Sequence, residues 1–220
     1  MQDRDPQFVE KALAILDLLF TPPTDGPLFC VDEKTGIGVR MPTAPDQPPA
    51  PGRAARREFE YMRNGTVDLL ASFCVQDGQV RGIVRPRHCS REFCELLDLL
   101  DQETPVGQTL HLILDTVSLH RSKEVAAWQA ERPVGRFVFH FLPVHSSWLS
   151  FIEVWFSILN RKCLKRAVFP TATVASEQIE AFIATYNRHS AHPFAWKKGV
   201  RFYRRLQVKL AERAALALAA

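Results

Sequence analysis

Leu110-His111-Leu112-Ile113-Leu114-Asp115 is an apolar run of strand length that stops at a carboxylate. Leu28-Phe29-Cys30-Val31-Asp32 repeats this pattern near the beginning of the chain. A short and nearly continuous apolar run is typical of a strand that is buried on both faces of a sheet. We therefore predict two buried strands, each of which delivers an aspartate at its end.

Further strands and helices surround these two runs. The dipeptide Asp77-Gly78 lies between apolar runs at residues 67–75 and 79–85, which predicts an antiparallel hairpin because both turn positions tolerate positive φ. Another strand is expected at residues 137–141. The spacing of apolar residues predicts helices at residues 7–20, 90–103, 122–131 and 173–186. This order of elements indicates an α/β fold, with a mixed five-stranded sheet flanked by helices.

A third acidic residue, Glu153, lies in a helix that is predicted to follow the fifth strand. The apolar residues of this helix, from Leu149 to Leu159, are spaced by three and four, and Glu153 lies at the margin of their stripe. The first and fourth strands can be neighbours in an open sheet. A helix packed across them would then bring Glu153 beside Asp32 and Asp115.

Three charged carboxylates share one small site only when cations neutralise them. Oxygen ligands without His or Cys favour Mg²⁺ or Mn²⁺ over zinc, and a pair of such ions promotes phosphodiester chemistry. We therefore expect Asp32, Asp115 and Glu153 to form a catalytic site that holds two divalent ions. Each acid alone also has a plainer interpretation, since the aspartates can cap turns and Glu153 can pair with Arg161 or Lys162.

The charge of the chain permits a polyanionic partner. Lys and Arg number 28 against 24 for Asp and Glu in 220 residues, a net charge of +4. One basic cluster accompanies a proline-rich loop at residues 42–52, which we expect not to pair in a sheet, and a second follows Glu153 on the same helix. Each cluster can also be an ordinary solvated surface. The candidate DNA-binding residues are Arg53, Arg56, Arg57, His120, Arg161, Lys162, Lys165 and Arg166, and a third basic run contains Lys197, Lys198, Arg201, Arg204 and Arg205.

Other classes of protein are disfavoured by composition. The five cysteines are scattered and form no Cys-x-x-Cys pair, so neither a disulfide framework nor a structural zinc site is indicated. No apolar run approaches the roughly 18 residues that a membrane span requires, and the first residues do not have the pattern of a signal peptide. We expect a cytoplasmic protein.

Several motifs accompany the three acidic residues along the chain. They are Val31-Asp32-Glu33-Lys34-Thr35-Gly36-Ile37, Leu110 to Asp115 with Ser118, His120 and Ser122, Leu142-Pro143, Ser146-Ser147-Trp148-Leu149, Ile152-Glu153, Trp155-Phe156, Tyr186-Asn187, Pro193-Phe194 and Trp196-Lys197. Over about residues 5–205 this set resembles bacterial insertion-sequence transposases of the mariner-like superfamily. The resemblance implies a ribonuclease H-like fold and a D-D-E triad of Asp32, Asp115 and Glu153, with 37 residues between the last two.

The resemblance also implies a reaction and its partners. Two divalent ions, Mg²⁺ or Mn²⁺, would activate water to cut a phosphodiester at the end of the mobile element, and the freed 3′-hydroxyl would then attack target DNA. The expected partner is double-stranded DNA, at the element ends and at the target. A homodimer is expected during synapsis, because two ends are processed together, and the expected location is the bacterial cytoplasm, at the nucleoid when bound to DNA.

The chain departs from the family pattern at two positions near the triad. Thr116 and Ser150 stand where the family usually has Asn, and both bear on how the metal or phosphate is positioned. The 31 residues before Asp32 leave no room for the family's N-terminal helix-turn-helix. We therefore expect a helix and linker at 1–26, a catalytic domain at 27–195, and a basic, then alanine-rich tail at 196–220. The alternatives are a ribonuclease H-like nuclease that does not join strands and a catalytically silent DNA-binding remnant.

Overall fold

A mixed five-stranded sheet forms the centre of the molecule, as expected. The computed structural model describes residues 5–117, 120, 122–196 and 199–218. The strand order is β3-β2-β1-β4-β5; β1 pairs antiparallel with β2 and β2 with β3, whereas β1 pairs parallel with β4 and β4 with β5. The strands are β1 (Leu28–Pro42), β2 (Tyr61–Cys74), β3 (Val80–Arg85), β4 (Leu110–Leu114) and β5 (Phe137–Phe141).

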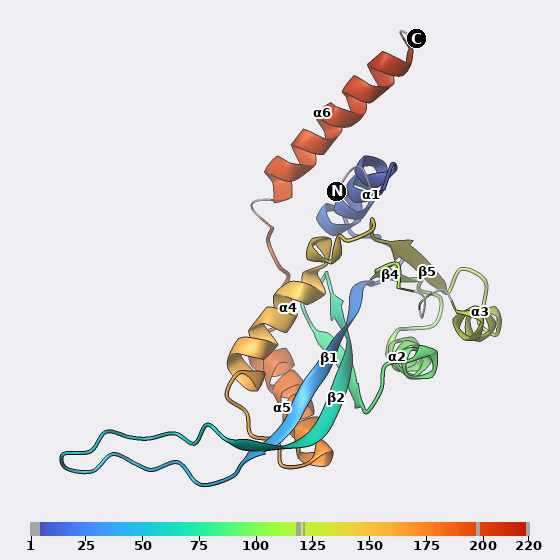
Figure 1. Ribbon diagram of the computed structural model, residues 1–220. Coiled ribbons are helices and arrows are strands. Elements are labelled where there is room, and N and C mark those ends of the chain that lie inside the picture. The colour runs from blue at the N-terminus through green and yellow to red at the C-terminus, as the bar shows by residue number, and fades with distance from the viewer. Residues whose placement is uncertain (1–4, 118–119, 121, 197–198, 219–220) are drawn as a thin grey trace.

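Helices cover both faces of this sheet (Figure 1), with α4 and α5 on one side and α2 and α3 on the other. A 3₁₀ turn at Ser147–Leu149 precedes α4, and a π-helical turn at Asn160–Leu164 follows it. The helices are α1 (Phe8–Phe20), α2 (Ser90–Glu103), α3 (Lys123–Ala130), α4 (Phe151–Leu159), α5 (Ala172–His189) and α6 (Gly199–Leu218). Each helix that we predicted from apolar spacing is present within a few residues of its expected bounds.

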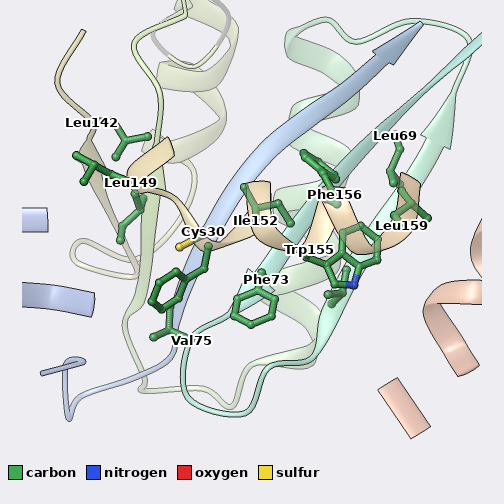
Figure 2. Packing of buried hydrophobic residues seen from close by; sticks show 14 of the residues in the cluster. Cys30, Leu69, Phe73, Val75, Leu142, Leu149, Ile152, Trp155, Phe156 and Leu159 are labelled. Atoms are coloured by element: carbon green, nitrogen blue, oxygen red, sulfur yellow. The ribbon is translucent and has the colours of Figure 1, made fainter. Parts of the chain in front are cut away.

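The apolar run of β1 is divided between two cores because successive side chains of a strand point to opposite faces. Cys30 belongs to the core under α4, whereas Phe29 and Val31 belong to the core under α2. Figure 2 shows the first core, where the buried side chains of α4 extend over β1 and β2. This packing fixes α4 across the middle of the sheet, which determines where its polar residues lie.

The first strand is longer than the sequence indicated. We predicted that it ends at Asp32, but β1 continues to Pro42, so Asp32 lies within the strand. β4 pairs only with residues Leu28 to Cys30 of β1, and from Asp32 onward this edge of β1 carries no neighbouring strand of the described sheet. The alternation of apolar residues that identifies a half-buried strand is weak there, and a bulge after Lys34 interrupts it further.

Residues 43–60 form a long arm that connects β1 to β2 and projects from the body of the molecule (Figure 1). We expected an unpaired loop, but isolated antiparallel bridges join Gln47 to Arg56 and Ala50 to Arg53. Gln47 and Ala50 are not prolines and keep their N–H groups, so they can donate hydrogen bonds across the arm. The proline-rich segment is therefore a two-stranded projection, and Arg53, Arg56 and Arg57 are exposed on it.

The two terminal helices pack together beside the sheet. α1 contributes one face to the same core as α4, and Leu206 of α6 is buried against that core. The rings of Phe20 and Tyr203 meet edge to face at 5.6 Å. Within the part of the chain that the structure describes, we find no helix with the length and apolar character of a membrane span.

Candidate active site

The register between β1 and β4 brings the two candidate aspartates together. Cys30 pairs with Ile113 in the parallel ladder. Asp32 and Asp115 each come two residues after this last pair, so both leave the end of the ladder at the same level of the sheet, and the charge of Asp115 acts on Asp32. The prediction that the first and fourth strands are neighbours in the sheet is confirmed.

Glu153 approaches from α4, in the first turn of the helix. We expected this helix to include Leu149, but the 3₁₀ turn Ser147–Leu149 comes first and α4 begins at Phe151, so Glu153 lies closer to the helix N-terminus than predicted. The positive end of a helix dipole stabilises a carboxylate at this position. Ser150, one of the two departures from the family pattern, is the buried N-cap residue.

The negative charge of Asp32 is unfavourable in this site. Burial raises the pKa of the Asp32 carboxyl, and repulsion from Glu33, Asp115 and Glu153 raises it further, although a hydrogen bond from the Glu33 N–H (2.8 Å) opposes them; the pKa is about 7. The repulsion shows that Asp115 and Glu153 both lie within electrostatic reach of Asp32. A cation between the three carboxylates would remove this penalty.

Divalent cations fit the site in donor chemistry and charge. The three candidate ligands supply only carboxylate oxygens, which are the donors that Mg²⁺ and Mn²⁺ prefer. Among the residues that the structure describes, no three His, Cys, Asp or Glu side chains are already arranged to hold one metal ion. The carboxylates of Asp32, Asp115 and Glu153 would therefore have to draw together as cations bind.

His120 lies beside these carboxylates, in the interior. Its Nε2 is 3.1 Å from Glu33 Oε1 and its Nδ1 is 3.0 Å from Asp115 Oδ1, while its ring packs on Phe93 at 4.5 Å. Burial alone would lower the pKa of His120, but the two carboxylates raise it to about 9. The imidazole is fully buried, which does not suit the contact with a DNA phosphate that we expected from the sequence.

His120 in turn affects Asp115. Burial raises the pKa of the Asp115 carboxyl, but the ion pair with His120 and a hydrogen bond from the Val117 N–H bring the pKa below its usual value. Glu33, which completes the chain of contacts, is a residue that our sequence reasoning did not single out. Because it follows Asp32 on a strand, its side chain points to the opposite face, and the consecutive polar residues from Asp32 to Thr35 gave no alternation that could have identified it.

The candidate DNA-binding residues lie in separate parts of the molecule. α4 ends at Leu159, so Arg161 and Lys162 lie in the π-helical turn, and Lys165 and Arg166 follow it, all four exposed. The arm carries the other arginines and projects away from α3 and β5 (Figure 1). Lys197 and Lys198 of the third basic run lie outside the described residues, whereas Arg201, Arg204 and Arg205 are exposed on α6.

Comparison with known proteins gives the family. A sequence profile of the family described as DDE superfamily endonuclease matches residues 27–175. The chain belongs to this family. The matched segment contains Asp32, Asp115 and Glu153, and also His120, whereas α6 lies beyond it. No curated protein matches the chain in sequence.

Solved structures show the same fold at low sequence identity. The chain superimposes on the crystal structure of the Mos1 mariner paired end complex with Mn, with a TM-score of 0.55, 14% identity and 94% of this chain covered. The crystal structure of the Mos1 Strand Transfer Complex gives a TM-score of 0.54 with 13% identity and 97% coverage. The fold is therefore ribonuclease H-like. In both comparisons the match spans 60% of the length of the Mos1 chain.

Proposed function

We propose that this DDE endonuclease is the catalytic part of a DNA transposase, which cuts the ends of a mobile element and joins them to target DNA with divalent metal. The proposal is supported by the parallel pairing of β1 with β4, which ends two residues before Asp32 and Asp115, and by the repulsion that Asp115 and Glu153 exert on Asp32. Structures of similar fold are described as a paired end complex and a strand transfer complex of Mos1, which supports this choice of reaction.

Each residue of the site then has a role. Asp32, Asp115 and Glu153 would hold two Mg²⁺ or Mn²⁺ ions, which when bound polarise an attacking oxygen and stabilise a leaving one. His120 holds Oδ1 of Asp115, so it orients this carboxylate, and Glu33 holds His120 from the other side. The N-terminus of α4 stabilises the charge of Glu153.

The partners follow from the same proposal. Double-stranded DNA is the substrate, at the element ends and at the target, and two copies of the chain act together on two ends. The exposed cations of the arm and of the turn after α4 would contact its phosphates, which gives binding that is sensitive to salt and largely independent of sequence. We further propose a bacterial insertion sequence as the source of the chain and the cytoplasm as its location.

Two assays with purified protein test the proposal. Nicking of supercoiled plasmid in Mn²⁺ or Mg²⁺ measures cleavage, and joining of a labelled duplex with a free 3′-hydroxyl to that plasmid measures strand transfer. We expect Asp32→Asn and Glu153→Gln to reduce both activities at least about 100-fold, because each removes a metal ligand. The matched control is Glu177→Gln, which changes an exposed glutamate on α5 and should leave both activities unchanged.

The two assays also separate the alternatives. Nicking without any joined product would favour a nuclease that does not transfer strands. DNA binding without nicking in either metal would favour a catalytically silent DNA-binding remnant. Activity that survives in both the Asp32→Asn and the Glu153→Gln variant would overturn the assignment of the site.

Metal binding can be measured without activity. Mn²⁺ should raise the melting temperature of the wild-type protein at pH 7.5, since a ligand that binds only the folded state at 100 times its Kd stabilises it by about 2.7 kcal/mol. We expect no such rise for Asp32→Asn, whereas Glu177→Gln should respond like the wild type. An equal response of Asp32→Asn to Mn²⁺ would place the metal elsewhere.

A further inference from the structure

A polar cleft of about 470 Å³ runs along β1, beyond Asp32. One wall is the part of β1 from Lys34 to Arg40, and the other is formed by the π-helical turn and the segment after it, including Asn160 and Lys165. A hydrogen bond from the Phe169 N–H to the Arg40 carbonyl (3.1 Å) joins the two walls at the end distant from Asp32. The cleft is therefore built between two elements that also carry the candidate catalytic residues.

The charged side chains that line this cleft are all positive. Its described lining includes the cations Lys34, Arg40 and Lys165 and contains no carboxylate. Within the described part of the chain, none of the three forms an ion pair with an acidic side chain. Arg40 lies over the ring of Tyr61, with 5.1 Å between the guanidinium carbon and the ring centre, which restricts its position without neutralising it. Three uncompensated cations in one cleft suit an anionic ligand.

The floor of the cleft leaves room for that ligand. Gly36 and Gly38 lie between the two cations of β1, and a side-chain β-carbon added at either glycine would meet no other atom within 4 Å. Glycine within a strand often marks a bulge or a place where a ligand approaches the backbone closely. The ladder of β1 shifts its register between Lys34 and Ile37, so a bulge is present here, and the open space above both glycines leaves room for a ligand.

The π-helical turn supplies the opposite wall. The Lys165 N–H donates to the Asn160 carbonyl at 2.8 Å, five residues back, which widens the helix locally. Such turns are frequent at functional sites. Asn160 lies seven residues after Glu153, about 10 Å along the helix axis, whereas Lys34 lies two residues after Asp32, about 7 Å along β1. Each wall of the cleft therefore begins within about 10 Å along the chain of a candidate catalytic carboxylate.

We infer that this cleft, lined by Lys34, Arg40 and Lys165, binds consecutive backbone phosphates of the DNA strand that enters the candidate active site. The inference rests on the proposed function and adds to it a site for one strand of the substrate. Phosphates follow one another every 3.4 Å along the axis of each strand, and the seven residues from Lys34 to Arg40 extend over about 20 Å at most, so the cleft can take several phosphates. It contacts only phosphate and sugar, so it contributes affinity and direction rather than sequence recognition.

The salt dependence of DNA binding tests this assignment. Binding of a labelled 30-base-pair duplex is measured by fluorescence anisotropy in EDTA, between 50 and 250 mM NaCl, so that cleavage is not required. Each phosphate contact contributes about 0.9 to the slope of log Kobs against log salt. The triple variant Lys34→Gln, Arg40→Gln, Lys165→Gln should lower the magnitude of this slope by about 3, equally for duplexes of unrelated sequence.

Three variants control for the loss of charge and for folding. Arg87→Gln, Arg188→Gln and Lys209→Gln together remove the same charge from exposed positions before α2, on α5 and on α6, and should change the slope by less than 1. Lys165→Gln alone changes an exposed side chain and should lower it by about 1 even if the triple variant folds poorly. Gly38→Val keeps every charge and fills the floor, so we expect at least a fivefold loss of affinity at 150 mM NaCl with a normal melting temperature.

The outcomes distinguish this inference from the proposed function. If the wild type binds and nicks DNA while the cleft variants keep the wild-type slope, the inference is wrong and the proposed function stands. An equal loss of slope in the control triple variant would also overturn it, because the effect would then be one of overall charge. If the wild type neither binds nor nicks DNA, both fail.

Discussion

Asp32 and Asp115 lie side by side, but their surroundings act on their charges in opposite directions. Burial and three neighbouring carboxylates raise the pKa of Asp32, whereas His120 lowers the pKa of Asp115. Pairs of titratable groups whose pKa values are driven apart are common at sites of chemistry. At this site the difference arises because Asp115 has a cationic partner in His120 and Asp32 has none in the described residues.

Asp32→Asn should stabilise the protein, and more so at high pH. The pKa of Asp32 is about 7 in the folded state against an ordinary value of 3.8, so the folded state loses stability as the pH rises from about 4 through 7. A shift of this size corresponds to up to about 4 kcal/mol, and about 1 kcal/mol changes the melting temperature by 2–4 °C in a chain of this length. We therefore expect a rise of up to about 8–16 °C at pH 8 in EDTA, and a clearly smaller one at pH 5. A rise of equal size at both values would contradict the origin we give for the pKa shift.

His120→Gln should have the opposite effect. The pKa of His120 is about 9 in the folded state, above its ordinary value of 6.5, so the stability it provides is fully present below pH 6.5 and is lost as the pH rises through 9. Urea unfolding should show the variant less stable than the wild type by up to about 3 kcal/mol at pH 6, with most of this difference gone at pH 9.5. The cysteines titrate in both proteins and cancel in the comparison. Parallel pH profiles would show that the ion pairs of His120 with Glu33 and Asp115 do not stabilise the fold.

At the scale of elements, α4 is a short helix held in place by one buried face. Ile152 is completely buried in the core, whereas Val154, two residues along, is 48% exposed. Ile152→Ala should reduce the free energy of unfolding by about 2–5 kcal/mol, because it leaves a cavity between α4 and the sheet. Val154→Ala, the matched control on the same helix, should change it by less than about 0.5 kcal/mol. Urea unfolding of both variants checks the difference, and equal losses would mean that α4 is not anchored by this face.

The sequence predicted those elements whose burial is regular. β4 is a short apolar run that is buried throughout, and β5 is an apolar run that pairs parallel with it at the edge of the sheet. The Asp77-Gly78 turn was identified because Gly78 tolerates positive φ, which it adopts (73°). The second half of β1 could not be recognised, since Glu33, Lys34 and Thr35 follow one another as polar residues on a strand with an open edge. Apolar and polar residues alternate along a strand only where one of its faces is buried, and a strand with an open edge beside a bulge has little buried surface.

Part of the candidate site could also be predicted from the regular burial of the elements that carry it. The three carboxylates could be selected because each follows or lies within an apolar run, so the fold dictates where they stand. Glu33 and the cleft along β1 depend instead on the unpredicted half of that strand, and the position of Lys165 depends on a π-helical turn. A π-helical turn differs from an α-helical one by a single hydrogen-bond shift, from four residues to five, and the residues Asn160 to Leu164 contain no pattern that requires it.

For the whole molecule, stability and the proposed contacts with DNA belong to different parts. The two cores on either side of the sheet contain the buried apolar residues, while the arm at residues 43–60 is exposed at every position except the half-buried Glu58. The isolated β-bridges that join its two sides bury almost no apolar surface. An element of this kind contributes little to the stability of the fold. We therefore infer that the arm and its three arginines serve binding.

Replacing residues 46–57 by an Asn-Gly turn should therefore leave the melting temperature within about 3 °C of the wild type, since about 1 kcal/mol or less of packing is lost. If Arg53, Arg56 and Arg57 each contact a phosphate, the slope of log Kobs against log salt should fall in magnitude by about 3 for duplex DNA. The triple variant Arg53→Gln, Arg56→Gln, Arg57→Gln keeps the arm and should give the same fall. A loss of affinity with the shortened arm but not with this variant would show that the arm acts through its shape or through a second copy of the chain. A normal slope in both would remove the arm from the DNA-binding surface and leave the cleft beside the carboxylates as the main electrostatic contact.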